Sequence, residues 1–201
     1  MENINYNWLK NSEERSFATK AILSCFKNRI LDNNNAIQKS ITENEELLSA
    51  ASILKEFNHL CVTIWKDSLY DNNTYLHLIM QVARIGKYPF PIPISEIKDD
   101  YLTSGNNSNF KLHLISNEVK HEIELVKGNY LDYNFLKLIV RASNSNNANG
   151  KFYIVNNESM ETGFSFVYLD SQEYALISEK RLLELEELSE ESIDKINIWI
   201  K

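Results

Sequence analysis

Histidine and cysteine are the residues of this chain best suited to metal binding or nucleophilic chemistry, and their spacing favours neither. The four histidines are far apart in the sequence: His59, His77, His113 and His121. His121-Glu122 resembles the start of a zinc-binding helix, but Leu125 occupies the position of the second histidine of that motif. Cys61 follows His59 by two residues, so on a helix their side chains would point to different faces. We expect no metal site and no cysteine nucleophile.

Carboxylates are more numerous and therefore less specific. Glu158, Glu161, Asp170 and Glu173 flank two apolar segments, where a nuclease or glycosidase could place its acids. Acids beside a hairpin turn are far more often solvated turn residues. The sequence contains no G-x-S-x-G, P-loop or G-x-G-x-x-G motif, and its five glycines are isolated. We therefore predict no catalytic residue and no cofactor.

The elements that must position these residues are helical in the first half. Asn11 with Glu14 three residues later favours a helix start, and apolar residues then recur at helical spacing as far as Ile30. Thr42 and Glu45 repeat this capping pattern, and the spacing after them predicts a second helix of about five turns through residue 65. The two helices are expected to pack as an antiparallel pair.

The second half changes to a period of two. Apolar residues alternate with polar ones over 110–114 and 119–125, which predicts a hairpin turned at Ser116-Asn117. The further predictions are strands over 151–155, 164–169 and 174–177, and helices that begin at Ser95 and Ser178. Three apolar segments fit either a helix or a strand: 75–85, for which helix is preferred, 130–140 and 193–200.

Helices first and a mainly antiparallel sheet later indicate the α+β class, with a C-terminal helix. We expect a single domain over 1–201, in which 1–88 and 94–201 could form a helical and a mixed sub-lobe. Cys25 and Cys61 fall on apolar stripes, so buried thiols in a reducing compartment are expected. No apolar run is long enough to span a membrane and the N-terminus does not resemble a secretory signal, so we expect a cytoplasmic protein without membrane contact.

The charge is unevenly distributed along the chain. The net charge is -7, which argues against direct nucleic-acid binding. Residues 1–157 contain 17 acidic and 17 basic residues, whereas residues 158–201 contain 11 acidic and 4 basic ones. The C-terminal region therefore holds the whole excess. It is either a solvated helix face, with Ser189 as a cap before two glutamates, or an acidic patch that docks a basic partner.

The functional hypothesis is a protein-binding inhibitor, in its concrete form an acidic bacterial immunity protein that neutralises a basic toxin such as a nuclease. The candidate partner-binding residues are Glu184, Glu186, Glu187, Glu190, Glu191, Tyr168, Asp170 and Glu173. One alternative is a small metal-dependent enzyme acting on nucleic acid or nucleotides, with Asp170 and Glu173 as metal ligands. Another is a phage-associated or effector-associated adaptor, which would differ from the immunity protein only in its partner.

Overall fold

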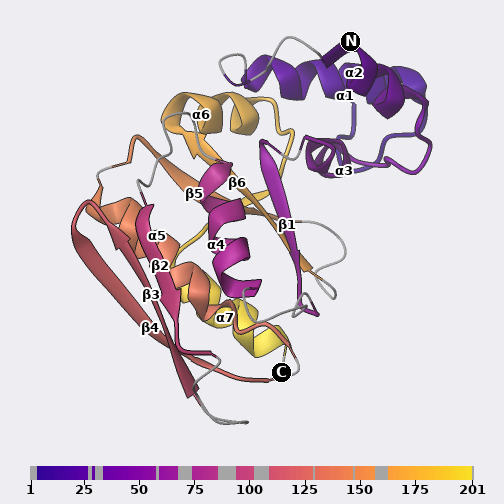
Figure 1. The fold of residues 1–201 in the computed structure, drawn as a ribbon. Coiled ribbons are helices and arrows are strands. Elements are labelled where there is room, and N and C mark those ends of the chain that lie inside the picture. The colour runs from indigo at the N-terminus through magenta and orange to yellow at the C-terminus, as the bar shows by residue number, and fades with distance from the viewer. Residues whose placement is uncertain are drawn as a thin grey trace.

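The protein is an α+β fold in which two antiparallel sheets and several helices are stacked (Figure 1). The computed structural model describes residues 4–26, 29, 34–57, 59–67, 74–85, 94–101, 109–128, 130–146, 148–156 and 163–200. Its elements in chain order are α1 Ser12–Cys25, α2 Asn34–Glu43, α3 Ala50–Lys55, β1 Cys61–Trp65, α4 Thr74–Arg84, β2 Ile94–Asp99, β3 Asn109–Ser116, β4 Val119–Val126, the 3-10 helix η1 Tyr133–Phe135, α5 Leu136–Ser145, β5 Gly150–Val155, β6 Gly163–Asp170, α6 Ser171–Glu179, β7 Leu185–Glu187 and α7 Glu190–Ile200.

The central sheet has the strand order β1-β6-β5-β7, and its two middle strands, β6 and β5, are buried on both faces. All its described pairs are antiparallel, and β1 reaches β6 across about half the chain, with Cys61 opposite Val167. Strand β6 is buried at every interior position, which explains its uninterrupted apolar sequence. The sheet therefore joins the helical first half of the chain to the mixed second half.

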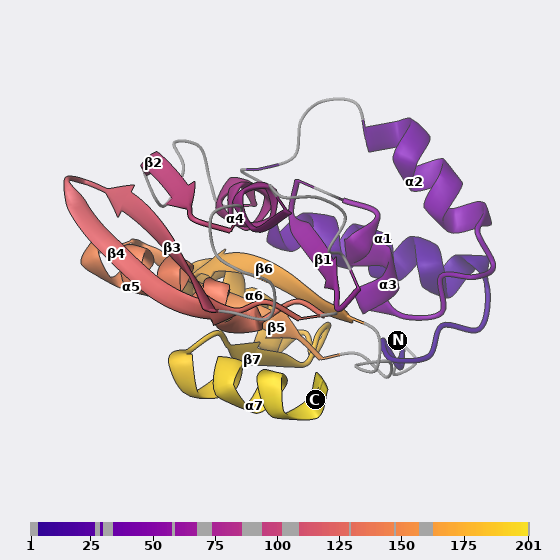
Figure 2. The ribbon, with the colours of Figure 1, turned by 60° about the horizontal axis from the view of Figure 1, so that its bottom comes forward.

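Two hydrophobic cores lie on opposite faces of the central sheet. Alternate β6 residues divide between them: Phe166 belongs to one core and Val167 to the other. The first core packs α4 and α5 between the central sheet and the outer sheet β2-β3-β4, and it also includes α7, which packs against η1 and α5. The second core packs α1, α3 and α6 on the opposite face of the central sheet. The outer sheet and helices α1–α3 thus lie at opposite ends of the molecule (Figure 2).

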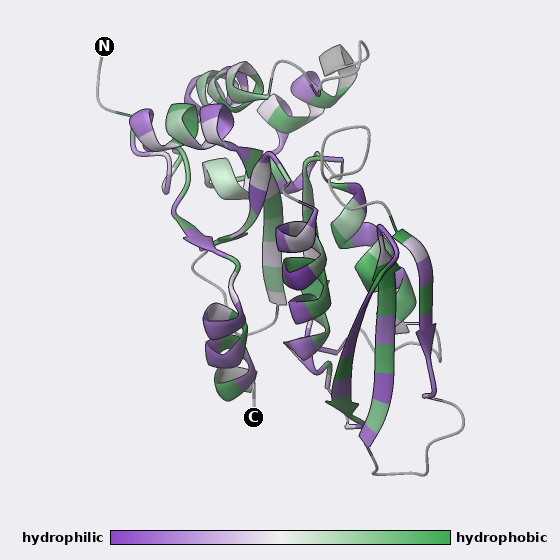
Figure 3. Cartoon of the chain, turned by 90° about the vertical axis from the view of Figure 1, so that its left-hand side faces the viewer, coloured by the Kyte–Doolittle hydropathy of each residue, from purple (hydrophilic) through white to green (hydrophobic). Residues whose placement is uncertain are grey.

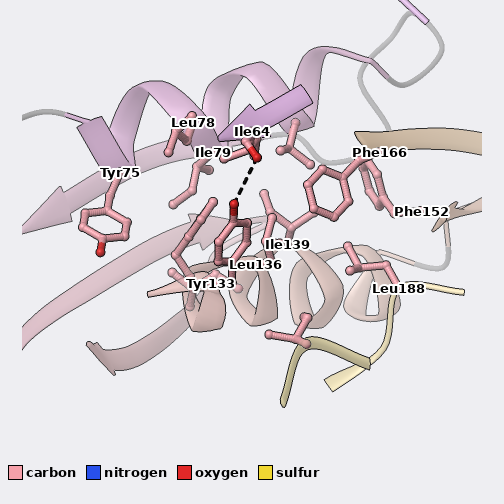
Figure 4. Packing of buried hydrophobic residues seen from close by; sticks show 14 of the residues in the cluster. Ile64, Tyr75, Leu78, Ile79, Tyr133, Leu136, Ile139, Phe152, Phe166 and Leu188 are labelled. Carbon is pink, nitrogen blue, oxygen red and sulfur yellow. Dashed lines mark hydrogen bonds between the residues drawn. The ribbon is translucent and has the colours of Figure 1, made fainter. Parts of the chain in front are cut away.

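Tyr133 anchors the first core (Figure 4). Its side chain is fully buried, and its hydroxyl donates a hydrogen bond of 3.0 Å to the carbonyl oxygen of Ile64 on β1. Burial raises the pKa of the hydroxyl. The bond satisfies a polar group that would otherwise be stranded among Ile139, Phe164 and their neighbours.

The predicted hairpin is confirmed as β3 and β4, but the predicted turn at Ser116-Asn117 is wrong by one residue, because Ser116 still pairs with Val119. Leu112 pairs with Ile123, and Asn117 and Glu118 form the turn with positive φ of 46° and 66°. Figure 3 shows hydrophobic and hydrophilic residues alternating along both strands. The predicted start of α1 is also confirmed, because the Asn11 side chain accepts a hydrogen bond from the backbone N–H of Glu14.

The apolar segments left open by the sequence are all helical. Residues 75–85 form α4, 130–140 enter η1 and α5, and 193–200 lie in α7. The Ser189 hydroxyl accepts a hydrogen bond from the N–H of Ser192, as expected for the cap of α7.

The long second helix predicted over 42–65 is wrong. Thr42 lies near the end of α2, and the short helix α3 begins at a capping box formed by Ser49 and Ser52. Residues 61–65 form strand β1, in which Val62, Thr63 and Ile64 are β-branched and pair with β6. The apolar residues over 42–65 that show helical spacing thus belong to two elements, α3 and β1, joined by a turn.

Three other predicted elements are also wrong. Ser95 lies in strand β2 rather than starting a helix. The expected strand 174–177 lies in α6, because Asp170 and Glu173 form a complete capping box and the turn at 170–171 becomes a helix start. The helix expected from Ser178 is replaced by a turn and strand β7.

Candidate functional site

The predicted partner-binding residues fall into an internal group and a surface group. Tyr168 is only 3% exposed, and its side chain packs in the first core beside Phe152. Asp170 and Glu173 serve the N-terminus of α6: Asp170 Oδ1 accepts from Glu173 N at 2.8 Å, and Glu173 Oε2 accepts from Asp170 N at 3.0 Å. The structure therefore removes Tyr168 and Glu173 from the candidate surface.

Glu173 also accepts two hydrogen bonds from Arg29. Arg29 Nε lies 3.0 Å from Glu173 Oε1, Nη2 lies 2.5 Å from Oε2, and both side chains are about 95% buried. The remaining guanidinium donors reach the carbonyl oxygens of Ile85 and Tyr168 at 3.0 and 2.6 Å. The carboxylate that the enzyme hypothesis assigned to a metal is thus bound by a cation of the chain itself.

The five surface glutamates define what we call the acidic surface: Glu184, Glu186, Glu187, Glu190 and Glu191. Glu184 directly precedes β7, Glu186 and Glu187 lie on that strand, and the last two begin α7 (Figure 2). Three of them have ion-pair partners: Glu187 with Lys151 at 2.7 Å, Glu190 with Arg141 at 2.9 Å and Glu191 with Lys195 at 3.0 Å.

The charge excess of the C-terminal region is partly cancelled in space. Four of its acids pair with bases from the neutral part of the sequence: Arg29–Glu173, Lys137–Asp194, Arg141–Glu190 and Lys151–Glu187. The hydrogen bonds from Arg141 lower the pKa of Glu190, which keeps that carboxylate ionised. Within the described part of the chain, Glu179, Glu184 and Glu186 form no ion pair.

A groove that the sequence did not reveal opens beside Glu184. It has a volume of about 1120 Å³ and lies between the N-terminal segment, α1 and the turn from α6 to β7. Its lining includes Phe17, Tyr174, Arg181 and Glu184. We call it the aromatic groove, because Phe17 is 44% and Tyr174 39% exposed. The Tyr174 ring stacks on the ring of Tyr153, and the two ring centroids are 4.9 Å apart.

The contacts of Ser24 and of the two cysteines do not favour a role as nucleophiles. Lys180 Nζ donates to Ser24 Oγ at 2.6 Å, while the Ser24 hydroxyl donates to the carbonyl oxygen of Ala21. This is the back-bonding of a serine near a helix end. Both cysteines are buried and free, and burial raises the pKa of the Cys61 thiol to about 12, so the reactive thiolate is disfavoured.

The described histidines do not form a cluster that could bind a metal ion. His113 lies opposite Glu122 in the hairpin register, and its Nε2 is 3.1 Å from Glu96 Oε1. Among the described residues no group of three or more His, Cys, Asp or Glu side chains could hold a metal ion. Glu158 and Glu161 lie outside the described residues.

We expect the free energy of unfolding to decrease in mild acid because of His59 and His121. Burial, and then a nearby arginine, lowers the pKa of each imidazole in the folded state. As the pH falls below about 6.5, the unfolded chain takes up protons that the folded chain does not, so the free energy of unfolding decreases until the folded pKa is passed. Denaturant titrations from pH 8 to about 5 should show this decrease. A double His59→Gln, His121→Gln variant with the same pH dependence as the parent would contradict it.

Comparison of the chain with protein-family models, with curated proteins and with solved structures found no match. Within the described residues, no helix combines the length and apolar character needed to cross a membrane.

Proposed function

We propose that this chain is a protein-binding inhibitor of a basic partner, most concretely an immunity protein that covers the active site of a toxin such as a nuclease. The observation that carries the proposal is the aromatic groove, where Phe17 and Tyr174 remain exposed beside the uncompensated Glu184. Aromatic residues next to polar ones are typical of the central contacts of protein interfaces.

The lining of the groove favours a protein segment as its occupant. Pockets for small ligands generally enclose most of the ligand. The aromatic groove has a volume of about 1120 Å³ and is lined by three separate parts of the chain. A loop or helix of a partner could lie along it and bury the two exposed rings.

Charge supports a basic partner. The groove is lined by two acids, Glu179 and Glu184, and by two bases, Lys180 and Arg181, of which Lys180 is directed at Ser24 Oγ. Glu186 follows on β7, and none of the three glutamates has an ion pair in the described chain. Asn7 Nδ2 donates to Glu184 Oε1 at 3.3 Å, but an amide does not neutralise the carboxylate. Carboxylates without an internal ion pair attract an oppositely charged surface and speed its association. Glu187, Glu190 and Glu191 are held by bases of this chain and contribute less to that attraction.

The proposal predicts which glutamates control binding. A double Glu184→Gln, Glu186→Gln variant should bind the purified product of a toxin-like reading frame next to this gene more slowly, by about tenfold at low salt, and with a weaker salt dependence. Binding kinetics by surface plasmon resonance at several salt concentrations would measure this. Inhibition of the partner's nuclease activity should weaken in parallel.

Glu45→Gln supplies a matched control, because Glu45 is an exposed glutamate on the connection between α2 and α3. This variant should bind as the parent does. The proposal fails if the parent chain and the neighbouring product form no complex at low or moderate salt. The role of the uncompensated glutamates fails if the double variant and the control behave alike.

A further inference from the structure

Helix α6 ends in a turn that normally contains glycine. Leu182 N donates to Ile177 O at 3.1 Å and Arg181 N donates to Ser178 O at 3.1 Å, which together form a Schellman motif. Leu182 and Ile177 are both buried in the second core, as the hydrophobic contact of that motif requires. Arg181 occupies the left-handed position, with φ 52°.

An arginine is a poor choice for this position. Glycine is preferred there because a side chain raises the energy of the left-handed conformation, and asparagine is the usual substitute. The stability of the fold therefore does not account for Arg181. A residue that opposes its local backbone preference points to a role for its side chain.

The Arg181 side chain lies on the wall of the aromatic groove. It is exposed and forms no ion pair with any described residue. The other cation at this turn, Lys180, is directed at Ser24 Oγ. Arg181 and the exposed Tyr174 thus line the same groove, and arginine and tyrosine are both common at interface hot spots.

We propose that Arg181 is a partner-binding residue that pairs with a carboxylate next to the apolar side chain that enters the aromatic groove. This inference rests on the proposed function and names the chemistry of the contacting segment: an aromatic or aliphatic anchor with an Asp or Glu beside it. Such a segment places its carboxylate on Arg181, while a basic residue of the surrounding surface faces Glu184. A guanidinium binds a carboxylate through two parallel hydrogen bonds, which fixes the orientation of the segment.

The test separates binding from stability. A random-peptide phage library is panned on the full chain, and the selected peptides are titrated calorimetrically into the parent, Arg181→Gly and Glu118→Gly. Glu118 is the matched control, because it also has a positive φ, of 66°, but lies in the hairpin turn of the outer sheet. Glycine should raise the denaturation midpoint at both positions.

We expect the selected peptides to share an acidic residue beside an apolar one and to bind Arg181→Gly at least about tenfold more weakly than the parent. Glu118→Gly should bind them unchanged. Because both variants are expected to be more stable, weaker binding by Arg181→Gly cannot come from unfolding.

Three results would overturn the inference: no peptide is selected, the peptides bind Arg181→Gly as tightly as the parent, or Arg181→Gly has a lower midpoint. The inference and the proposed function can fail separately. A complex with the neighbouring gene product that depends on Glu184 but not on Arg181 would overturn the inference alone. The absence of that complex, with Arg181-dependent peptides, would overturn the proposed function alone.

Discussion

Replacement of Arg29 by methionine is expected to lower the free energy of unfolding by about 3–5 kcal/mol, because it leaves the buried Glu173 carboxylate without its counter-ion. The guanidinium forms four hydrogen bonds and lies over the rings of Phe26 and Tyr168 at 5.5 and 5.7 Å. Methionine retains much of the apolar volume but none of the donors. Urea denaturation followed by circular dichroism would measure the loss.

The same contacts explain why the effect should be large. Arg29 follows α1, Ile85 follows α4, and Tyr168 and Glu173 belong to β6 and α6, so one side chain joins four parts of the chain. Glu173 also completes the capping box of α6. Loss of Arg29 therefore weakens the attachment of the helical first half to the central sheet and the start of α6 together.

Arg141→Met is the matched control. Arg141 also forms a two-point pair with a glutamate, Glu190, at 2.9 Å for both hydrogen bonds, but the side chains are 37% and 45% exposed. Solvent screens such a pair, so we expect a loss of about 0–1 kcal/mol. Equal losses for Arg29→Met and Arg141→Met would show that burial of the first pair has no energetic consequence.

The elements that the sequence predicted correctly carry a local signal. The β3–β4 hairpin shows a strict alternation and a short turn, and α1 begins with a side-chain cap. Strand β1 lacks such a signal, since its partner β6 lies about one hundred residues away, with Cys61 opposite Val167. Helical spacing over 42–65 could not reveal that pairing. The start of α6 was different: Asp170 and Glu173 have capping-box spacing, and that signal was present in the sequence but interpreted as a turn.

The candidate site was predictable only in part. The sequence located the excess charge in residues 158–201, but an ion pair depends on distance in space. Lys137, Arg141 and Lys151 approach this region from α5 and β5, and Arg29 approaches it from beyond α1. Glu184 and Glu186 form no ion pair with any described base, although Asn7 Nδ2 donates to Glu184 Oε1 at 3.3 Å and the charge of Glu186 helps to raise the pKa of Lys195. The aromatic groove brings together residues 4–7, Phe17 and the turn after α6, a proximity that no spacing in the sequence indicates.

Gly150→Ala is expected to destabilise the central sheet by roughly 3 kcal/mol, near the upper limit for overpacking. A Cβ at this position would lie 2.3 Å from the carbonyl oxygen of Leu169 and 2.9 Å from the Tyr168 ring. Gly150 begins β5 opposite Asp170, the residue that ends β6 and caps α6. Because the contact is with backbone rather than with a flexible side chain, β5 and β6 must separate there, which disturbs the ladder and the helix cap together.

Gly128→Ala should have the opposite effect. A Cβ at Gly128 would meet nothing closer than 3.9 Å, and the glycine does not have a positive φ. Alanine then lowers the conformational entropy of the unfolded chain without strain in the folded one. The free energy of unfolding should therefore rise by about 0.4–1 kcal/mol. Paired thermal and urea denaturation of the two variants would measure both changes. Equal effects at the two glycines would mean that the close approach of β5 to β6 at Gly150 does not constrain the sheet.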